Sequence, residues 1–249
     1  MTQGRRLSGK VALVTGAGRG IGQQIALRLA REGAGLIVHY SGSAAGAEET
    51  VKAVEAGGGE AFAVQADIAR RAEVKAMFDR IDAKTDRLDI VVNSAGVSGG
   101  GSLAELDEDQ LEWMLGVNLR GPLFVASEAA RRLGEGGRII NLGSSLGEFP
   151  IAGSGIYSAT KVAIKSMTES WAKELGKKGV TVNTVIPGAT APGMMDSAPE
   201  GYRSLFENAS PFGRIGKAEE IAAVVAFLAS PEASWVSGAH ILANGAANM

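Results

Sequence analysis

Two residues in the sequence have the side chains and the spacing needed for proton transfer, Tyr157 and Lys161. If the segment 156–178 forms a helix, residues four positions apart lie on one face, so the phenol and the ammonium would be neighbours. A free phenol has a pKa of about 10, and an adjacent cation favours the phenolate and brings that pKa toward the working range. The pair therefore predicts acid/base chemistry, although the same spacing also occurs in ordinary surface pairs on helices.

A glycine-rich segment, residues 15–22, begins at the end of an apolar run and leads into an apolar helical pattern. Glycines let backbone N–H groups approach a pyrophosphate, and a helix N-terminus adds a positive dipole end. A plain strand–turn–helix connection is the alternative, but the position at the start of a βαβ pattern favours a dinucleotide-binding loop. Gly22 would also let the helix pack closely against the strand. The expected contacts are Gly16, Gly20, Ile21 and Gly22.

The end of the second apolar run indicates which dinucleotide is bound. An acidic residue there would accept hydrogen bonds from the ribose 2′-OH of NAD, but no carboxylate follows before Glu48. Arg19 could instead pair with a 2′-phosphate, with hydroxyls nearby. The sequence thus favours NADP(H) over NAD(H), while a solvated loop charge at Arg19 and a half-exposed His39 are the plain alternatives. The further contacts expected at this corner are Tyr40, Ser41 and Ser43.

Short apolar, β-branched runs alternate with amphipathic stretches along the whole chain. Near-continuous apolar strands indicate a sheet buried on both faces, and the repeated alternation predicts a three-layer, doubly wound parallel sheet (Rossmann fold) of about seven strands. We expect one domain, residues 1–249, with a flexible arm at 1–9 and a substrate-binding loop at 189–212. The expected strands are Val11–Thr15, Leu36–Tyr40, Ala61–Gln65, Ile90–Asn93, Arg138–Leu142, Val180–Ile186 and His240–Leu242, and the expected helices lie near 21–32, 44–56, 70–84, 107–133, 156–178 and 217–229.

Composition excludes several kinds of chemistry. The absence of cysteine removes disulfides, cysteine-based zinc or iron–sulfur sites and thiol nucleophiles, and two distant histidines make a histidine metal site improbable. A net charge of −2 gives no general attraction to nucleic acid or anionic lipid, and there is no long apolar span. We therefore expect a cytoplasmic protein with no metal and no nucleic-acid or membrane partner.

Further markers occur in order along the chain: Asp67, Asn93-Ser94-Ala95-Gly96, Asn118, Ser144, the Tyr157/Lys161 pair and Pro187-Gly188. With the glycine-rich segment, they resemble the compact single-domain branch of the short-chain dehydrogenase/reductase family, from Lys10 to Gly245. Within it, the chain is similar to 3-oxoacyl-[acyl-carrier-protein] reductase-like and polyhydroxynaphthalene reductase-like ketoreductases.

The resemblance implies a catalytic role for each member of a tetrad. Tyr157 would give a proton to the carbonyl oxygen or take one from the alcohol, and Ser144 would hydrogen-bond the same oxygen. Lys161 would lower the tyrosine pKa and hold the nicotinamide ribose. Asn118 would support a water that links Lys161 to solvent. Ser145 is the rival hydroxyl to Ser144.

The resemblance also implies cofactor contacts beyond the glycine-rich segment. Asp67 and Ile68 would bracket the adenine, while Asn93, Ala95 and Gly96 would line the riboses. The nicotinamide would meet Pro187, Gly188 and Thr190. The family usually places a threonine four residues beyond this glycine, where the chain has Pro192; either Thr190 makes that contact or the contact is absent. Ser94 replaces a frequent asparagine, and we expect little consequence.

The resulting expectation is an NADP(H)-dependent carbonyl reductase acting on a small-molecule ketone or secondary alcohol. The alternatives are an NAD-dependent alcohol or sugar dehydrogenase and a nucleotide-sensing regulator without turnover. The resemblance implies a homotetramer that uses the helices near 107–133 and 156–178 at one interface, and the last strand with helix 217–229 at the other. The expected walls of the substrate pocket include Phe149, Ile151, Met194 and Met195. Glu148 is expected to be either a solvated carboxylate or a substrate contact. If a carrier protein presents the substrate, basic residues beside the pocket entrance would bind it, and the candidates are Arg131, Arg132, Lys177 and Lys178.

Overall fold

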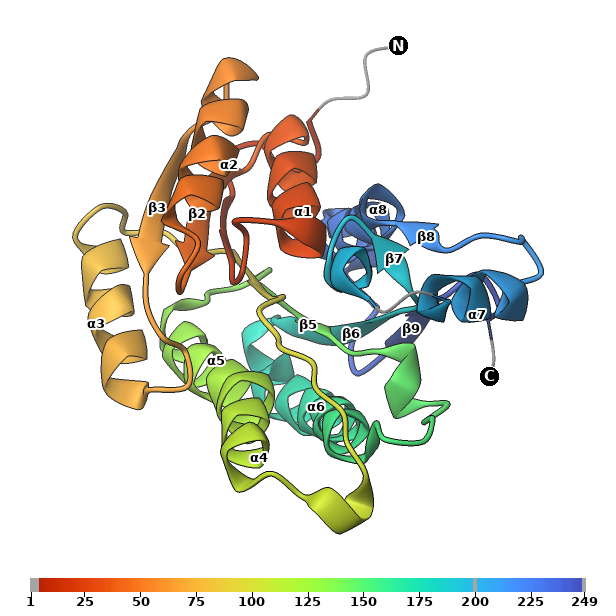
Figure 1. Cartoon of the computed structure of the whole chain (residues 1–249). Coiled ribbons are helices and arrows are strands. Elements are labelled where there is room, and N and C mark those ends of the chain that lie inside the picture. Colours follow the sequence, from red (N-terminus) through yellow and green to blue (C-terminus); the bar gives the residue numbers. More distant parts are fainter. Residues whose placement is uncertain (1–4, 199–200, 248–249) are drawn as a thin grey trace.

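The computed structural model describes residues 5–198 and 201–247, and its centre is a seven-stranded parallel sheet (Figure 1). The strand order is β3-β2-β1-β4-β5-β6-β9. This order confirms the predicted doubly wound sheet. The strands are β1 (Val11–Val14), β2 (Gly35–Tyr40), β3 (Ala61–Gln65), β4 (Ile90–Asn93), β5 (Arg138–Leu142), β6 (Thr181–Pro187) and β9 (His240–Ala243).

Helices cover both faces of this sheet (Figure 1). One apolar cluster joins α1, α2 and α8 to one face, and a second joins α3, α5 and the C-terminal part of α6 to the other. The bounds are α1 (Gly20–Arg31), α2 (Ala44–Ala56), α3 (Arg71–Asp82), α4 (Glu108–Leu115), α5 (Gly121–Arg132), α6 (Gly155–Leu175), α7 (Tyr202–Ala209) and α8 (Ala218–Ala229).

The alternation of side chains along each strand explains why the strands read as continuous apolar runs. In β1, Val14 belongs to the cluster beneath α1 and α8, while Leu13 belongs to the cluster beneath α3 and α5. Both side chains are fully buried. A side chain of this kind contributes roughly 1.5–3 kcal/mol when fully buried, so both faces of the sheet stabilise the fold.

The strand order changes direction at β1, which pairs with β2 on one side and β4 on the other. In doubly wound sheets the crevice at such a switch point, outside the carboxyl ends of the strands, binds the ligand. The glycine-rich segment follows β1 and the Asn93–Gly96 segment follows β4. The topology therefore brings these two predicted binding segments to one edge of the sheet.

The predicted helix near 107–133 is interrupted. It consists of α4, a π-helical turn η2 (Gly116–Arg120) and α5. Both ends of the turn are glycines that approach the segment after β3: a Cβ at Gly116 would lie 3.1 Å from the Ala69 Cβ, and one at Gly121 would lie 2.7 Å from the Ile68 Cδ1. This close packing, invisible to helical periodicity, accompanies the break.

Two further differences concern the ends of predicted segments. The expected loop after β6 contains α7 and strand β7 (Thr190–Ala191), which pairs with β8 (Gly216–Lys217).

In the expected flexible arm, residues 5–9 are packed against the domain, because Leu7 is 1% exposed and Arg6 forms ion pairs with Glu32 and Glu232. The remainder of that arm, residues 1–4, lies outside the described residues.

Candidate active site

Tyr157 and Lys161, the predicted acid/base pair, lie in the first turns of α6. Tyr157 and Lys161 are buried, with 8% and 7% of their surface exposed. The Lys161 Nζ lies 5.7 Å from the centre of the Tyr157 ring and donates a hydrogen bond of 3.1 Å to the Leu142 carbonyl at the end of β5. The helix thus places phenol and ammonium together, as the four-residue spacing predicts.

Ser144 lies on the segment that follows β5 and contacts the phenol. Its hydroxyl hydrogen-bonds with Tyr157, and its Oγ accepts a hydrogen bond of 3.2 Å from the Leu146 N–H. The second bond fixes the hydroxyl oxygen at the start of a short 3₁₀ turn, Ser145–Gly147. Ser144, which the family resemblance favours over the adjacent Ser145, is therefore in contact with the tyrosine.

Burial dominates the electrostatics of this pair. It raises the pKa of Tyr157, against the opposing effect of the Ser144 hydrogen bond, and it lowers the pKa of Lys161 to about 8. The family resemblance implies that Lys161 lowers the tyrosine pKa, but in this structure the removal of water from the phenolate has the larger effect and raises that pKa. The phenol is consequently protonated at neutral pH.

Asn118 occupies the centre of the π-helical turn. Its Oδ1 accepts from the Val97 N–H and its Nδ2 donates to the Val97 carbonyl, both at 2.8 Å, and Nδ2 also lies 3.4 Å from the Thr160 Oγ1. A Cβ on Gly96 would lie 3.4 Å from the Asn118 Oδ1 and 3.5 Å from the Lys161 Nζ. Asn118 and Lys161 thus both lie next to Gly96, in the segment after β4. The predicted tetrad requires these two side chains to be neighbours in this way.

The glycine-rich segment wraps closely over the start of α1. A Cβ on Gly22 would collide with the Gly16 carbonyl oxygen, so the absence of a side chain lets the start of α1 lie against the glycine-rich segment. At Gly16, where φ is +66°, a Cβ would approach the Ala95 Cα at 2.9 Å. No side chain caps α1 at its N-cap residue Arg19. The N–H groups of its first turn, including those of Gly20 and Ile21, are therefore oriented to receive an anion.

The N-terminus of α2 lies beside this segment. Thr50 of α2 donates a 2.9 Å hydrogen bond to the Ala17 carbonyl, and α2 has neither a side-chain cap at Ser43 nor an acidic residue in its first turn. Arg19, Ser41 and Ser43 are exposed, and Tyr40 is partly buried at the end of β2. This corner combines a free helix N-terminus, hydroxyls and a guanidinium, which together suit a phosphate.

Three predicted adenine and ribose contacts, Asp67, Ile68 and Asn93, already contact other residues of the protein. The Asp67 carboxylate accepts from the Ala69 N–H at 3.0 Å and lies 3.3 Å from the Arg70 guanidinium, while Ile68 is 3% exposed and packs near Gly121. Asn93 is buried at the end of β4; its Nδ2 donates to Asn141, but its Oδ1 has no hydrogen-bond partner among the described residues. An orphaned buried acceptor is uncommon in proteins and suits a ligand that donates here.

The segment after β6 approaches the glycine-rich segment from the other side. A Cβ on Gly20 would lie 3.1 Å from the Gly193 Cα, next to Pro192. Gly188, which follows Pro187, lies close to the backbone of Asn244. A Cβ on Gly188 would be only 2.9 Å from the Asn244 Cα, so a side chain would not fit there. Thr190 is 7% exposed within β7. Its contact with the nicotinamide stays a prediction.

The comparisons with known proteins agree with this arrangement. A family model described as enoyl-(acyl carrier protein) reductase matches residues 16–247. A probable tetrahydroxynaphthalene reductase from Zymoseptoria tritici is 38% identical over 257 residues, which cover 98% of this chain and 96% of that protein. The short chain dehydrogenase/reductase nsrJ from Aspergillus novofumigatus is 41% identical over 255 residues, which cover 97% of this chain and 97% of that protein. The chain belongs to the short-chain dehydrogenase/reductase family.

Solved structures of the family superimpose closely on this chain. A short-chain dehydrogenase from Burkholderia cenocepacia, crystallised with NADP, has a TM-score of 0.93 at 41% identity and covers 98% of this chain and 100% of its own. The angucycline C-6 ketoreductase LanV, also crystallised with NADP, has a TM-score of 0.92 at 37% identity and covers 97% of this chain and 96% of its own.

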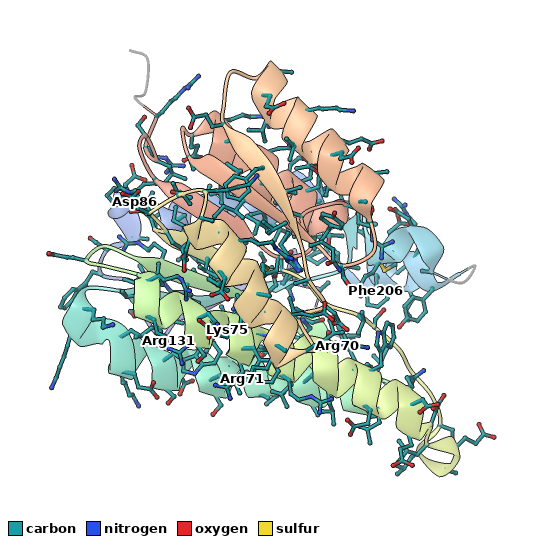
Figure 2. All side chains as sticks on the ribbon, turned by 90° about the vertical axis from the view of Figure 1, so that its left-hand side faces the viewer. Arg70, Arg71, Lys75, Asp86, Arg131 and Phe206 are labelled. Atoms are coloured by element: carbon teal, nitrogen blue, oxygen red, sulfur yellow. The ribbon has the colours of Figure 1, made fainter. Side chains whose placement is uncertain are left out.

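The cations considered for a carrier protein lie at the wrong edge of the sheet. Arg131 and Arg132 end α5 just before β5 begins, and Lys177 and Lys178 follow α6 just before β6 begins. The predicted tetrad, in contrast, lies where strands end. Figure 2 shows Arg131 and Asp86 toward one end of the molecule and Arg70 and Phe206 toward the other. The sequence expectation of basic residues beside the entrance is therefore wrong for these four.

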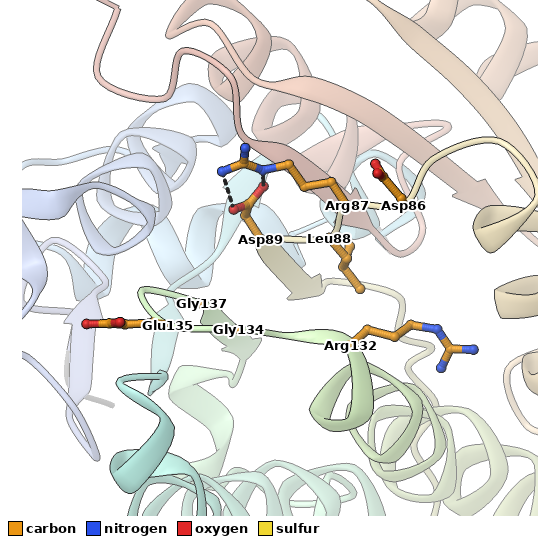
Figure 3. A pocket seen from close by; sticks show the side chains of 8 residues that line it. All are labelled: Asp86, Arg87, Leu88, Asp89, Arg132, Gly134, Glu135 and Gly137. Atoms are coloured by element: carbon orange, nitrogen blue, oxygen red, sulfur yellow. Dashed lines mark hydrogen bonds and ion pairs between the residues drawn. The ribbon is translucent and has the colours of Figure 1, made fainter.

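A pocket at that same edge is also unrelated to the tetrad (Figure 3). Its principal charges are neutralised within the protein, because Arg87 contacts Asp89 at 2.6 Å and Arg132 contacts Asp82 at 2.7 Å. Its lining residues are Asp86, Arg87, Leu88, Asp89, Arg132, Gly134, Glu135 and Gly137. None of them belongs to the predicted site.

Glu148, on the segment after Ser144, has a role that neither sequence interpretation includes. Its carboxylate accepts hydrogen bonds of 2.7 and 3.0 Å from Lys165, one turn beyond Lys161 on α6. This pair ties the serine segment to the tyrosine helix. The Gly101 N–H, on the segment between β4 and α4, donates a 3.1 Å hydrogen bond to the Gly153 carbonyl just before α6. This bond joins the segment after β4 to the segment that contains the expected pocket residues Phe149 and Ile151.

Two residues that sequence reasoning does not select also shape the site. Thr15 accepts hydrogen bonds of 3.0 Å from the N–H groups of both Ser94 and Ala95. His39, expected to be half-exposed, is 1% exposed and contacts Gly16. Its place inside an apolar run was the available signal, because a polar residue in a strand buried on both faces needs partners.

Two negative findings concern the ranges 5–198 and 201–247. Within them, no helix is long and apolar enough to cross a bilayer. No group of three or more His, Cys, Asp or Glu side chains that could hold a metal ion occurs in the same residues.

Proposed function

We propose that this chain is an NADP(H)-dependent ketoreductase that uses Tyr157 as its general acid. The observation that carries the proposal is the convergence of Tyr157, Ser144, Lys161 and Asn118 beside an uncapped glycine-rich helix start, at the carboxyl edge of the sheet. The whole chain forms one nucleotide-binding domain in this proposal, with segment 189–212 as the substrate-binding loop.

The residues present fit NADP(H). The first turn of α1 would hold the pyrophosphate, and Arg19 with Ser41 and Ser43 at the N-terminus of α2 would hold the 2′-phosphate. The free Oδ1 of Asn93 offers an acceptor at the end of β4. Two relatives of similar fold were crystallised with NADP, which supports the same choice. The remaining contacts proposed are Tyr40, Asp67, Ile68, Ala95, Gly96, Pro187, Gly188 and Thr190.

The chain's own residues would organise the proton transfer. NADPH, when bound, would supply the hydride. The Tyr157 phenol, protonated because it is buried, donates its proton to the carbonyl oxygen, and the Ser144 hydroxyl hydrogen-bonds that oxygen as charge develops on it. Lys161 stabilises the phenolate that results, and Asn118 orders a water through which Lys161 exchanges protons with solvent.

The proposed substrate is a free ketone on a fused ring system. One relative is named a tetrahydroxynaphthalene reductase and another an angucycline C-6 ketoreductase. The placement of the four candidate carrier-protein cations at the opposite edge of the sheet favours a free substrate over one presented by a carrier protein. A panel of such ketones and one enoyl thioester, with NADPH depletion as the readout, tests the substrate class. Reduction of the thioester alone would contradict the proposal.

Replacing Tyr157 with phenylalanine removes the proton donor while keeping the ring. We expect kcat for ketone reduction to fall by about 10²-fold or more, while the Kd for NADPH changes little, because general acid catalysis contributes on the order of 10²–10⁴-fold. Ser144→Ala should lose activity and Ser145→Ala should lose little, which forms a matched hydroxyl pair. A Tyr157→Phe enzyme as active as wild type would contradict the assignment, and tight NADPH binding with no turnover of any ketone would favour a regulator.

The pH dependence follows from the two buried groups. Because burial raises the Tyr157 pKa, the phenol stays protonated at neutral pH, so reduction should be fast there and alcohol oxidation should rise toward alkaline pH. Reduction should decline above about pH 8, where Lys161 loses its charge. Rates in both directions from about pH 6 to about pH 10 check this. Lys161→Arg should abolish the decline, and a reduction rate that increases through pH 8 would contradict the argument.

Arg19 should determine the choice between the two nicotinamide cofactors. Loss of a charge-assisted hydrogen bond to a phosphate costs about 1.5–3 kcal/mol, so Arg19→Ala should lower kcat/KM for NADPH by roughly 10- to 100-fold. The value for NADH should change little. Arg31→Ala, at the exposed far end of α1, is the matched control. A wild-type preference for NADH would favour the alternative of an NAD-dependent alcohol or sugar dehydrogenase.

We also propose the homotetramer and the cytoplasmic location that the family resemblance implies. Large apolar side chains are exposed on both expected interfaces: Trp113, Leu123 and Val162 on α4, α5 and α6, and Phe227, Trp235 and Leu242 near α8 and β9. Light scattering after size exclusion should give about 102 kDa, four times 25.5 kDa. Trp235→Arg should yield dimers, since Trp235 is 99% exposed in the single chain. A wild-type monomer would contradict the assembly.

A further inference from the structure

His39 is the one buried imidazole placed between the two segments that the proposed function assigns to the cofactor, among the residues that the structure describes. It is the penultimate residue of β2 and is 1% exposed. Its Nδ1 lies 3.2 Å from the Gly16 nitrogen and its Nε2 lies 3.0 Å from the Ala66 carbonyl oxygen. The side chain thus joins the segment after β1 to the segment after β3.

These two contacts specify one tautomer of the neutral His39 imidazole. A backbone N–H can only donate and a carbonyl can only accept, so Nδ1 must carry the lone pair and Nε2 the proton. Burial agrees with a neutral ring, because it lowers the pKa of His39 to about 4 against the opposing effects of the hydrogen bond to the Ala66 carbonyl and of the Asp67 carboxylate. A second proton would place an N–H on Nδ1 against the Gly16 N–H.

The positions of both contacts matter for the site. Gly16 opens the glycine-rich segment, and the His39 carbonyl also accepts a 2.9 Å hydrogen bond from the Ala17 N–H. Ala66 directly precedes Asp67, the proposed adenine contact. The hydrogen bond directs the Gly16 N–H to the His39 ring, and the first turn of α1, which has no side-chain cap, begins four residues further along the same segment.

We propose that His39 is a positioning residue for cofactor binding: its neutral imidazole sets the spacing between the pyrophosphate-binding and adenine-binding segments. It touches neither substrate nor reacting atoms. The inference rests on the proposed function, because it concerns the site in which NADPH is expected to bind.

Three variants separate the two hydrogen bonds. The amide oxygen of His39→Asn stands at the same number of bonds from the backbone as Nδ1, so it keeps an acceptor for Gly16. The amide nitrogen of His39→Gln corresponds to Nε2 and keeps a donor for Ala66. His39→Leu keeps the apolar volume and loses both. The other histidine, His240, gives the matched control His240→Leu, because it lies on β9 and contacts Glu169.

The measurement is the Kd for NADPH by fluorescence titration, with kcat at saturating NADPH and the melting temperature recorded for each variant. Each lost hydrogen bond should weaken binding by about 3- to 10-fold, so Leu should weaken it more than Asn or Gln does. The kcat at saturating NADPH should stay near the wild-type value, and His240→Leu should bind NADPH normally.

The outcomes are distinguishable. A folded His39→Leu enzyme that binds NADPH as tightly as wild type, with only its melting temperature lowered, would reduce His39 to a structural residue and overturn the inference. If His39→Leu does not fold, normal NADPH binding by both polar variants would overturn it equally. Wild-type protein that binds no NADPH would instead overturn the proposed function itself.

Discussion

The burial of the Lys161 ammonium is the constraint on which the site depends. A cation removed from water is costly unless neighbouring groups compensate, and here the Leu142 carbonyl at the end of β5 accepts its hydrogen bond. This contact requires α6 to lie close against the sheet. A buried chain of side-chain hydrogen bonds holds it there: Asn141 of β5 donates to Thr168 of α6 at 2.8 Å, and Thr168 lies 2.8 Å from Thr184 of β6. All three residues are fully buried, and a satisfied network of this kind favours one arrangement over its alternatives.

Close approach of backbone segments is the second requirement, and it explains some of the 35 glycines in the chain. Segments that follow β1, β4 and β6 meet at one edge of the sheet, and a Cβ would obstruct each meeting point. Gly16 passes Ala95, Gly22 passes the Gly16 carbonyl and Gly20 passes Gly193. Gly188 also has a structural reason to lack a side chain, because the space that a Cβ would fill is occupied by Asn244. Its glycine is therefore explained by packing of the chain on itself, whatever the cofactor contributes.

The sequence was sufficient for features that depend on local pattern. All seven strands of the main sheet were predicted to within about two residues, because strands buried on both faces are short apolar runs. The Tyr157/Lys161 contact was predicted because four-residue spacing on a helix needs no tertiary information. Hydrogen-bond partners that are distant in the sequence were not predictable from local pattern. Glu148 and Lys165 are 17 residues apart, and nothing in the sequence around either residue specifies that they pair. The edge on which Arg131 and Lys177 lie was predictable, since a residue between a helix and the next parallel strand must lie where strands begin.

The segments that would bind the cofactor are held mainly by side chains from neighbouring elements rather than by pairing with other strands. Thr15 accepts from the first two N–H groups after β4, and Asn118 contacts both the N–H and the carbonyl of Val97, as a paired strand would. The amide of Asn118 comes from a π-helical turn, a feature that often occurs at functional sites because it changes the direction of side chains along a helix. His39 holds the segments after β1 and β3 in the same manner. Because each backbone group is satisfied individually, these loops can keep a defined shape while the other N–H groups of the glycine-rich segment remain free for an anion.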